Sequence, residues 1–206
     1  MTEYLNANES SQNTKYSGFD SLGRTQAVSS FVRKKDVLKH SSRVLKRPAF
    51  PTSTKISGEY SDGRFDPTNK TWTGNISNNR IIQLSNYRGF LYNKSHLLAW
   101  SLGGSMDSVN VILGTRAQNV GHNNQKNSGG MAYPETKVRE FLKINPKKVV
   151  FYKAIPIYSG NELVPRGVHV LAQSVNNSKL LNLNVWVFNT QAGVSVNYLN
   201  GSFNSK

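Results

Sequence analysis

The last third of the chain carries short runs of β-branched and aromatic residues, and this pattern constrains the fold more than any other feature. The runs cover residues 149–158, 168–175, 183–188 and 194–198. Asn, Ser and Gly, which favour turns, separate them. We therefore predict an antiparallel meander that forms a scaffold sheet.

A strand–strand–helix unit is predicted in the middle of the chain. One strand begins near Phe90 and ends near His96, and a second apolar run covers residues 109–113. Residues 133–142 have apolar side chains at helical spacing, with Pro134 in the first turn, where proline is tolerated. The expected fold class is α+β, with this unit packed on a central antiparallel β-sheet and long loops elsewhere.

The rest of the chain gives weaker signals. Residues 1–16 are predicted to be a polar arm, and residues 17–206 a single domain, because 206 residues can bury one sizeable core. A short helix is predicted over residues 27–32, followed by a basic stretch over residues 33–47. No apolar run approaches the ~20 residues of a membrane span.

The charge balance indicates a polyanionic partner. Lys and Arg number 26 against 11 Asp and Glu, which gives a formal net charge of +15. Nucleic acid is the expected partner, since neutralised phosphates release counterions and strengthen binding; an anionic membrane or cell-wall polymer is the alternative. The chain has no cysteine, which excludes disulfides, a thiolate nucleophile and a Cys-based zinc site.

Three residues around the predicted unit form a minimal set for cutting a phosphodiester with one hydrated Mg²⁺. The imidazole of His96 can deprotonate water, the amide oxygen of Asn119 can hold the ion, and the carboxylate of Glu135 can orient its waters. Each also has a purely structural explanation: a histidine bonded to a carbonyl, a capping asparagine, and a glutamate stabilising a helix N-terminus.

The order of these residues resembles the DNA/RNA non-specific endonuclease family of ββα-metal (His-Me finger) nucleases, and streptococcal-type extracellular DNases in particular. The family carries an Asp-Arg-Gly-His motif, and Asn93-Lys94-Ser95-His96 stands in its place. The resemblance extends to Asn119 and to the segment that begins at Glu135. It implies a ββα-metal core over about residues 88–143.

By this resemblance His96 is the general base, Asn119 the direct metal ligand and Glu135 the carboxylate that organises the metal's waters. The residues expected to bind substrate are Lys94, Arg116, Gln118 and Arg139. Lys94 replaces the arginine of the motif, so a point charge stands where the family has a planar guanidinium.

The function predicted from the sequence is a sequence-non-specific, Mg²⁺-dependent endonuclease acting on DNA or RNA, with Mn²⁺ as an expected substitute and no small-molecule cofactor. We expect a monomer that acts outside the cell, with its signal peptide absent from this chain. A basic nucleic-acid-binding protein without catalytic activity is the alternative, because the charge alone fits it equally well.

Overall fold

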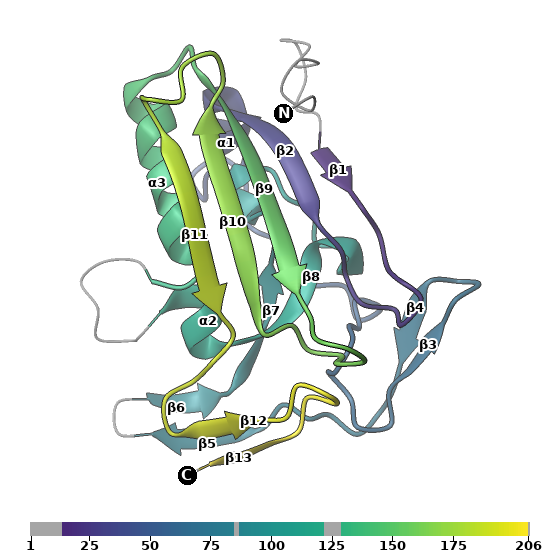
Figure 1. Ribbon diagram of the computed structural model, residues 1–206. Helices are drawn as coiled ribbons and strands as arrows, with labels where there is room; N and C mark the ends of the chain where they lie inside the picture. The colour runs from purple at the N-terminus through teal and green to yellow at the C-terminus, as the bar shows by residue number, and fades with distance from the viewer. Residues whose placement is uncertain (1–13, 85–86, 122–128, 206) are drawn as a thin grey trace.

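A five-stranded antiparallel sheet forms the scaffold of the molecule in the computed structural model (Figure 1). The structure describes residues 14–84, 87–121 and 129–205. The order across the sheet is β1-β2-β9-β10-β11, which confirms the predicted meander for its last three strands. These strands are β1 (Thr14–Tyr16), β2 (Val28–Arg33), β9 (Val149–Ile157), β10 (Gly167–Ser174) and β11 (Asn182–Phe188).

One face of the sheet packs against the helices and forms the main core. Val150, Tyr152 and Ala154 alternate along β9 and are fully buried there. Val138 and Leu142 of α3 (Ala132–Ile144) pack into the same cluster. The hydroxyl of Tyr152 donates to the carbonyl of Leu97 at 3.2 Å, which ties the sheet to the segment after His96.

The predicted strand–strand–helix unit is present and lies on the helical side of the sheet. β7 (Tyr92–His96) pairs antiparallel with β8 (Val111–Thr115), with His96 opposite Val111. Two helices follow, α2 (Arg116–Val120) and α3. The Thr115 hydroxyl accepts the N–H of Gln118 at 3.1 Å and so caps the first turn of α2.

Shorter elements complete the molecule. A second apolar cluster lies under the hairpins at the C-terminal end of the chain and includes Leu91, Tyr92 and Phe203. The remaining helices are α1 (Lys34–Lys39), η2 (Trp100–Leu102) and η3 (Ser108–Asn110). The remaining strands are β3 (Arg64–Asp66), β4 (Thr71–Thr73), β5 (Ile81–Leu84), β6 (Tyr87–Phe90), β12 (Val194–Val196) and β13 (Phe203–Ser205). Within the described ranges, no helix is long and apolar enough to cross a membrane.

Two expectations about local structure were wrong. The segment predicted as a helix over residues 27–32 is largely strand β2, in which Val28 and Val32 point into the core with a period of two. The run at residues 194–198 was assigned to the scaffold sheet, but β12 pairs with β13 in a separate hairpin. The expected arm ends in β1, which pairs with β2; residues 1–13 lie outside the described part of the chain.

Candidate active site

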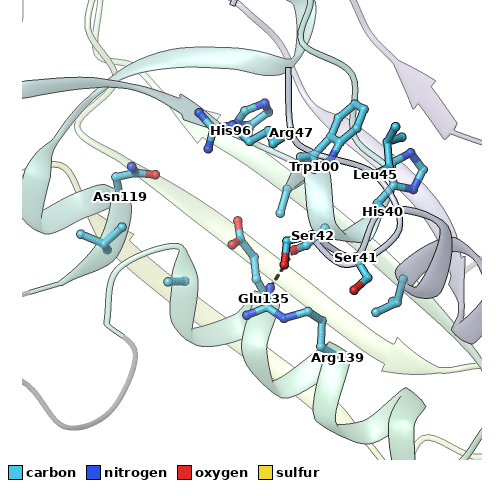
Figure 2. A pocket seen from close by; sticks show the side chains of 15 residues that line it. His40, Ser41, Ser42, Leu45, Arg47, His96, Trp100, Asn119, Glu135 and Arg139 are labelled. Carbon is cyan, nitrogen blue, oxygen red and sulfur yellow. Dashed lines mark hydrogen bonds between the residues drawn. The ribbon is translucent and has the colours of Figure 1, made fainter. Parts of the chain in front are cut away.

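A cavity of about 470 Å³ lies between the ββα unit and the segment around α1 (Figure 2). His96, Asn119, Glu135 and Arg139, four of the seven predicted site residues, line it. They come from the end of β7, from α2 and from α3. The opposite wall includes residues of α1 and of the segment that follows it, among them Arg47.

His96 is buried at the end of β7, with 7% of its surface exposed. Its ring stacks on Phe50 at a centroid distance of 5.0 Å, and its Nε2 lies 3.3 Å from the sulfur of Met106. Burial, and then the nearby charge of Arg47, lower the pKa of His96 to about 4. The imidazole is therefore neutral at pH 7, as a general base must be.

The contact with Met106 indicates which ring nitrogen carries the proton. A thioether sulfur can only accept a hydrogen bond, so the tautomer that satisfies this contact has its proton on Nε2. Nδ1 then carries the lone pair. The neighbouring loop is fixed by the buried Asn110, whose Oδ1 accepts the N–H of Leu98 at 2.9 Å.

Two residues of the motif segment hold the amide of Asn119. Its Nδ2 donates to Oδ1 of Asn93 at 2.9 Å, and its Oδ1 accepts the hydroxyl of Ser95 at 3.2 Å. Asn93 and Ser95 lie two apart on β7 and so share a face of the strand. Asn93 and Ser95 therefore orient Asn119, and the amide oxygen of Asn119 keeps a second lone pair for another partner.

Glu135 lies in the first turn of α3, and Figure 2 shows its carboxylate pointing into the space between His96 and Asn119. Loss of solvation raises the pKa of Glu135 to about 8, although the charges of Arg139 and Arg47 oppose the rise. Arg139 is held in place by donating to Ser101 Oγ at 2.8 Å and to Thr136 Oγ1 at 2.6 Å.

The donor set fits a hydrated hard cation better than a metal held by many side chains. In the described part of the chain, no group of three or more His, Cys, Asp or Glu residues could hold a metal ion. Asn119 offers one hard neutral oxygen, and Glu135 offers a carboxylate across the cavity. An ion that keeps most of its waters, as Mg²⁺ does, suits such a site.

Comparison with known proteins places the chain in a family. The sequence profile described as "DNA/RNA non-specific endonuclease" matches residues 54–176, which is more than half of the chain. The chain belongs to the DNA/RNA non-specific endonuclease family. The family predicted from the sequence is thereby confirmed.

Individual relatives agree with this family assignment. A deoxyribonuclease of Streptococcus dysgalactiae subsp. equisimilis is 39% identical over 148 residues, which cover 69% of this chain. The match spans 43% of the length of that relative. A solved structure of Sda1 nuclease with a bound zinc ion is 36% identical, with a TM-score of 0.78 over 94% of this chain and 82% of that one. NucA from Streptococcus agalactiae with a bound magnesium ion is 21% identical, with a TM-score of 0.69 over 96% of this chain and 80% of that one, and shows the shared fold.

The other predicted substrate-binding residues of this endonuclease-family chain do not line the cavity. The amine of Lys94 donates to the carbonyl of Thr54 and pairs with Glu59 at 3.2 Å. Arg116 lies over the ring of Tyr87 at 5.8 Å. Gln118 is buried, with 1% of its surface exposed.

Arg47 is the cavity residue that the sequence did not single out. Its guanidinium lies 5.5 Å from the centroid of the Phe50 ring, on which His96 also stacks. The only signal in the sequence was its place in the basic stretch over residues 33–47. Among the described residues, Arg47 and Arg139 are the Arg and Lys side chains that line the cavity.

Proposed function

We propose that the protein is a metal-dependent endonuclease that hydrolyses phosphodiester bonds of DNA or RNA without sequence preference, and that His96 is its general base. The observation that carries this proposal is the convergence of His96, Asn119 and Glu135 on one cavity. Family membership and the Streptococcus deoxyribonuclease relative support the reaction class.

In the proposed reaction, Nδ1 of His96 takes a proton from water, and the resulting hydroxide attacks phosphorus opposite the 3′ oxygen. The new P–O bond forms as the bond to the 3′ oxygen breaks, which leaves a 5′-phosphate and, after protonation, a 3′-hydroxyl. The neutral tautomer indicated by the Met106 contact is the form that can take this proton.

Asn119 is the proposed protein ligand of the metal, and Glu135 the acceptor for hydrogen bonds from the metal's waters. When bound, the ion supplies positive charge that stabilises the transition state and the leaving oxygen. We propose Mg²⁺ as the ion, with Mn²⁺ as a substitute. Asn93 and Ser95 keep the amide of Asn119 in place before the ion arrives.

Arg47 and Arg139 face the same cavity and are the proposed phosphate-binding groups. A guanidinium can donate two parallel hydrogen bonds to phosphate oxygens, and charge placed before the reaction starts costs no reorganisation during it. Phosphate contacts carry no sequence information, which fits a non-specific enzyme. We also propose that residues 17–206 act as one domain, as a monomer and outside the cell.

The test is product analysis on end-labelled DNA and RNA strands incubated with Mg²⁺, Mn²⁺ or EDTA. We expect cleavage at many positions with either metal and none in EDTA, and fragments with 5′-phosphates. Cleavage that proceeds fully in EDTA, or fragments with 3′-phosphates, would contradict the proposed chemistry. Binding without any cleavage would leave the alternative of a binding protein.

A further inference from the structure

The second face of the scaffold sheet is a large surface that the active site does not use. Figure 1 shows the helices on one side of the sheet, behind β9, β10 and β11 in that view. Among the described residues, no helix packs on the other face. The cavity is lined from the helical side, so the open face lies across the sheet from it.

Exposed aromatic residues gather on this face along the edge strand β11. Trp186 and Phe188 are two residues apart and therefore point to the same face, and they are 55% and 69% exposed. Trp186 stacks on His169 of β10 at 4.2 Å with an interplanar angle of 4°. Gly167 lies opposite Phe188, so no side chain from β10 stands directly across from the phenyl ring.

Polar groups around these rings are amides and not acids. Nε2 of His169 lies 2.6 Å from Oδ1 of Asn184, which leaves the amide nitrogen of Asn184 available as a donor near the rings. Gln173 and Asn182 face each other two residues further along the same face. The rings and amides together can contact a base both by stacking and by hydrogen bonding.

The charge of the sheet favours an anionic partner. Its five strands contain no aspartate or glutamate, and Lys15 and Lys153 lie on one face of it, both opposite Ser29. Lys153 lies opposite Leu171, which lies opposite Asn184, so the amine shares the face with the aromatic rings. An aromatic platform beside positive charge is the arrangement with which proteins bind single-stranded nucleic acid.

We propose that this face, defined by His169, Trp186 and Phe188, binds a single-stranded stretch of the nucleic-acid substrate outside the active site. Side chains at positions i and i+2 of a strand, such as these two rings, are about 6.6 Å apart along the strand. This exceeds the ~3.4 Å between stacked bases of a duplex strand, so the surface suits bases that have been unstacked. The inference rests on the proposed function in that it takes the ligand to be the enzyme's own substrate.

The consequence is a tether for long substrates. A strand held on the open face keeps its remaining length near the molecule, which raises the effective concentration of cleavable bonds at the cavity. Short oligonucleotides cannot reach both places at once. The surface should therefore favour long strands with single-stranded regions over short ones.

The binding test uses His96→Ala protein in EDTA, so that no strand is cut, with a fluorescent oligo-dT strand and a duplex of equal length as probes. We expect Trp186→Ala and Phe188→Ala each to raise the Kd for oligo-dT about five- to a hundredfold. The Kd for the duplex should change less than about twofold. Trp186→Phe, which keeps a stacking ring, should restore most of the affinity, and Leu199→Ala, at a site that is 56% exposed elsewhere, should have no effect.

The cleavage test compares wild-type protein with Trp186→Ala in Mg²⁺. We expect kcat/KM to fall on long single strands and to stay unchanged on strands of a few nucleotides. Unchanged affinity for oligo-dT in both alanine variants would overturn the inference. Alanine variants that lose affinity for a neutral polysaccharide but keep their affinity for oligo-dT would overturn it as well. Failure of the proposed function would look different: no cleavage of any strand, with binding still dependent on Trp186.

Discussion

Replacement of Glu135 by glutamine should stabilise the metal-free protein at alkaline pH while it abolishes activity. The carboxyl has an ordinary pKa of 4.5 in the unfolded chain and a pKa of about 8 in the folded protein. The folded protein therefore holds more protons than the unfolded chain between these values. The contribution of the Glu135 carboxyl to the free energy of unfolding is fully present below pH 4.5 and is lost as pH rises through about 8.

The size of the effect follows from the difference between the two pKa values. A difference of one pKa unit corresponds to about 1.4 kcal/mol, so ionised Glu135 costs the metal-free protein at most about 5 kcal/mol above pH 8. Glutamine has nearly the same shape and no charge to desolvate. The variant should thus match wild type near pH 4.5 and exceed its free energy of unfolding by about 2–5 kcal/mol at pH 9.

The assay is urea unfolding of both proteins in EDTA from pH 4.5 to pH 9, followed by circular dichroism. The lowered pKa of His96 produces a dependence of opposite sign, in which stability is lost as pH falls from about 6.5 to about 4. This dependence is common to both proteins and cancels in their difference. A difference that does not change with pH, or a variant less stable than wild type at pH 9, would refute the reasoning.

Four other substitutions separate the roles of the remaining residues. Met106→Leu removes the sulfur that accepts the hydrogen bond from Nε2 of His96. Loss of this bond, worth about 1 kcal/mol, should lower kcat about fivefold and leave KM unchanged in steady-state kinetics. Arg47→Ala should lower kcat/KM about a hundredfold. Lys94→Ala should lower it less than about threefold, because the Lys94 amine is paired with Glu59 and does not line the cavity; equal losses would contradict the placement of these cations. Asn119→Ala should weaken Mg²⁺ binding in titration calorimetry at least about a hundredfold, and unchanged binding would exclude it as the ligand.

The sequence predicted the scaffold and the ββα unit because their patterns are local. The apolar runs in the last third and the helical spacing around Val138 each occur within one element. The helix prediction for residues 27–32 was wrong because apolar residues at 27, 28, 31 and 32 fit a helix as well as a strand. Its pairing with β9, more than a hundred residues later, decided between the two.

The candidate site was predicted in part for the same reason. His96, Asn119 and Glu135 belong to one compact unit, so their order along the chain sufficed to group them. Arg47 comes from a segment about fifty residues before His96 that has no regular spacing, and only the fold brings it to the cavity. The position of Lys94 was not predictable, because alternation along β7 places it on the same face as His96. Its contacts with Thr54 and Glu59, residues distant in sequence, keep it out of the cavity lining.

The most direct test of the central claim is digestion of supercoiled plasmid at pH 7.5–8 by wild type and His96→Ala, each with Mg²⁺ and with EDTA. Binding of the same DNA is measured in parallel by gel shift. The account predicts cleavage by wild type in Mg²⁺ alone, and His96→Ala protein that shifts the DNA as wild type does but cuts it at least about a hundredfold more slowly. Cleavage by His96→Ala at the rate of wild type would contradict the account, as would DNA that wild type binds in Mg²⁺ and never cuts.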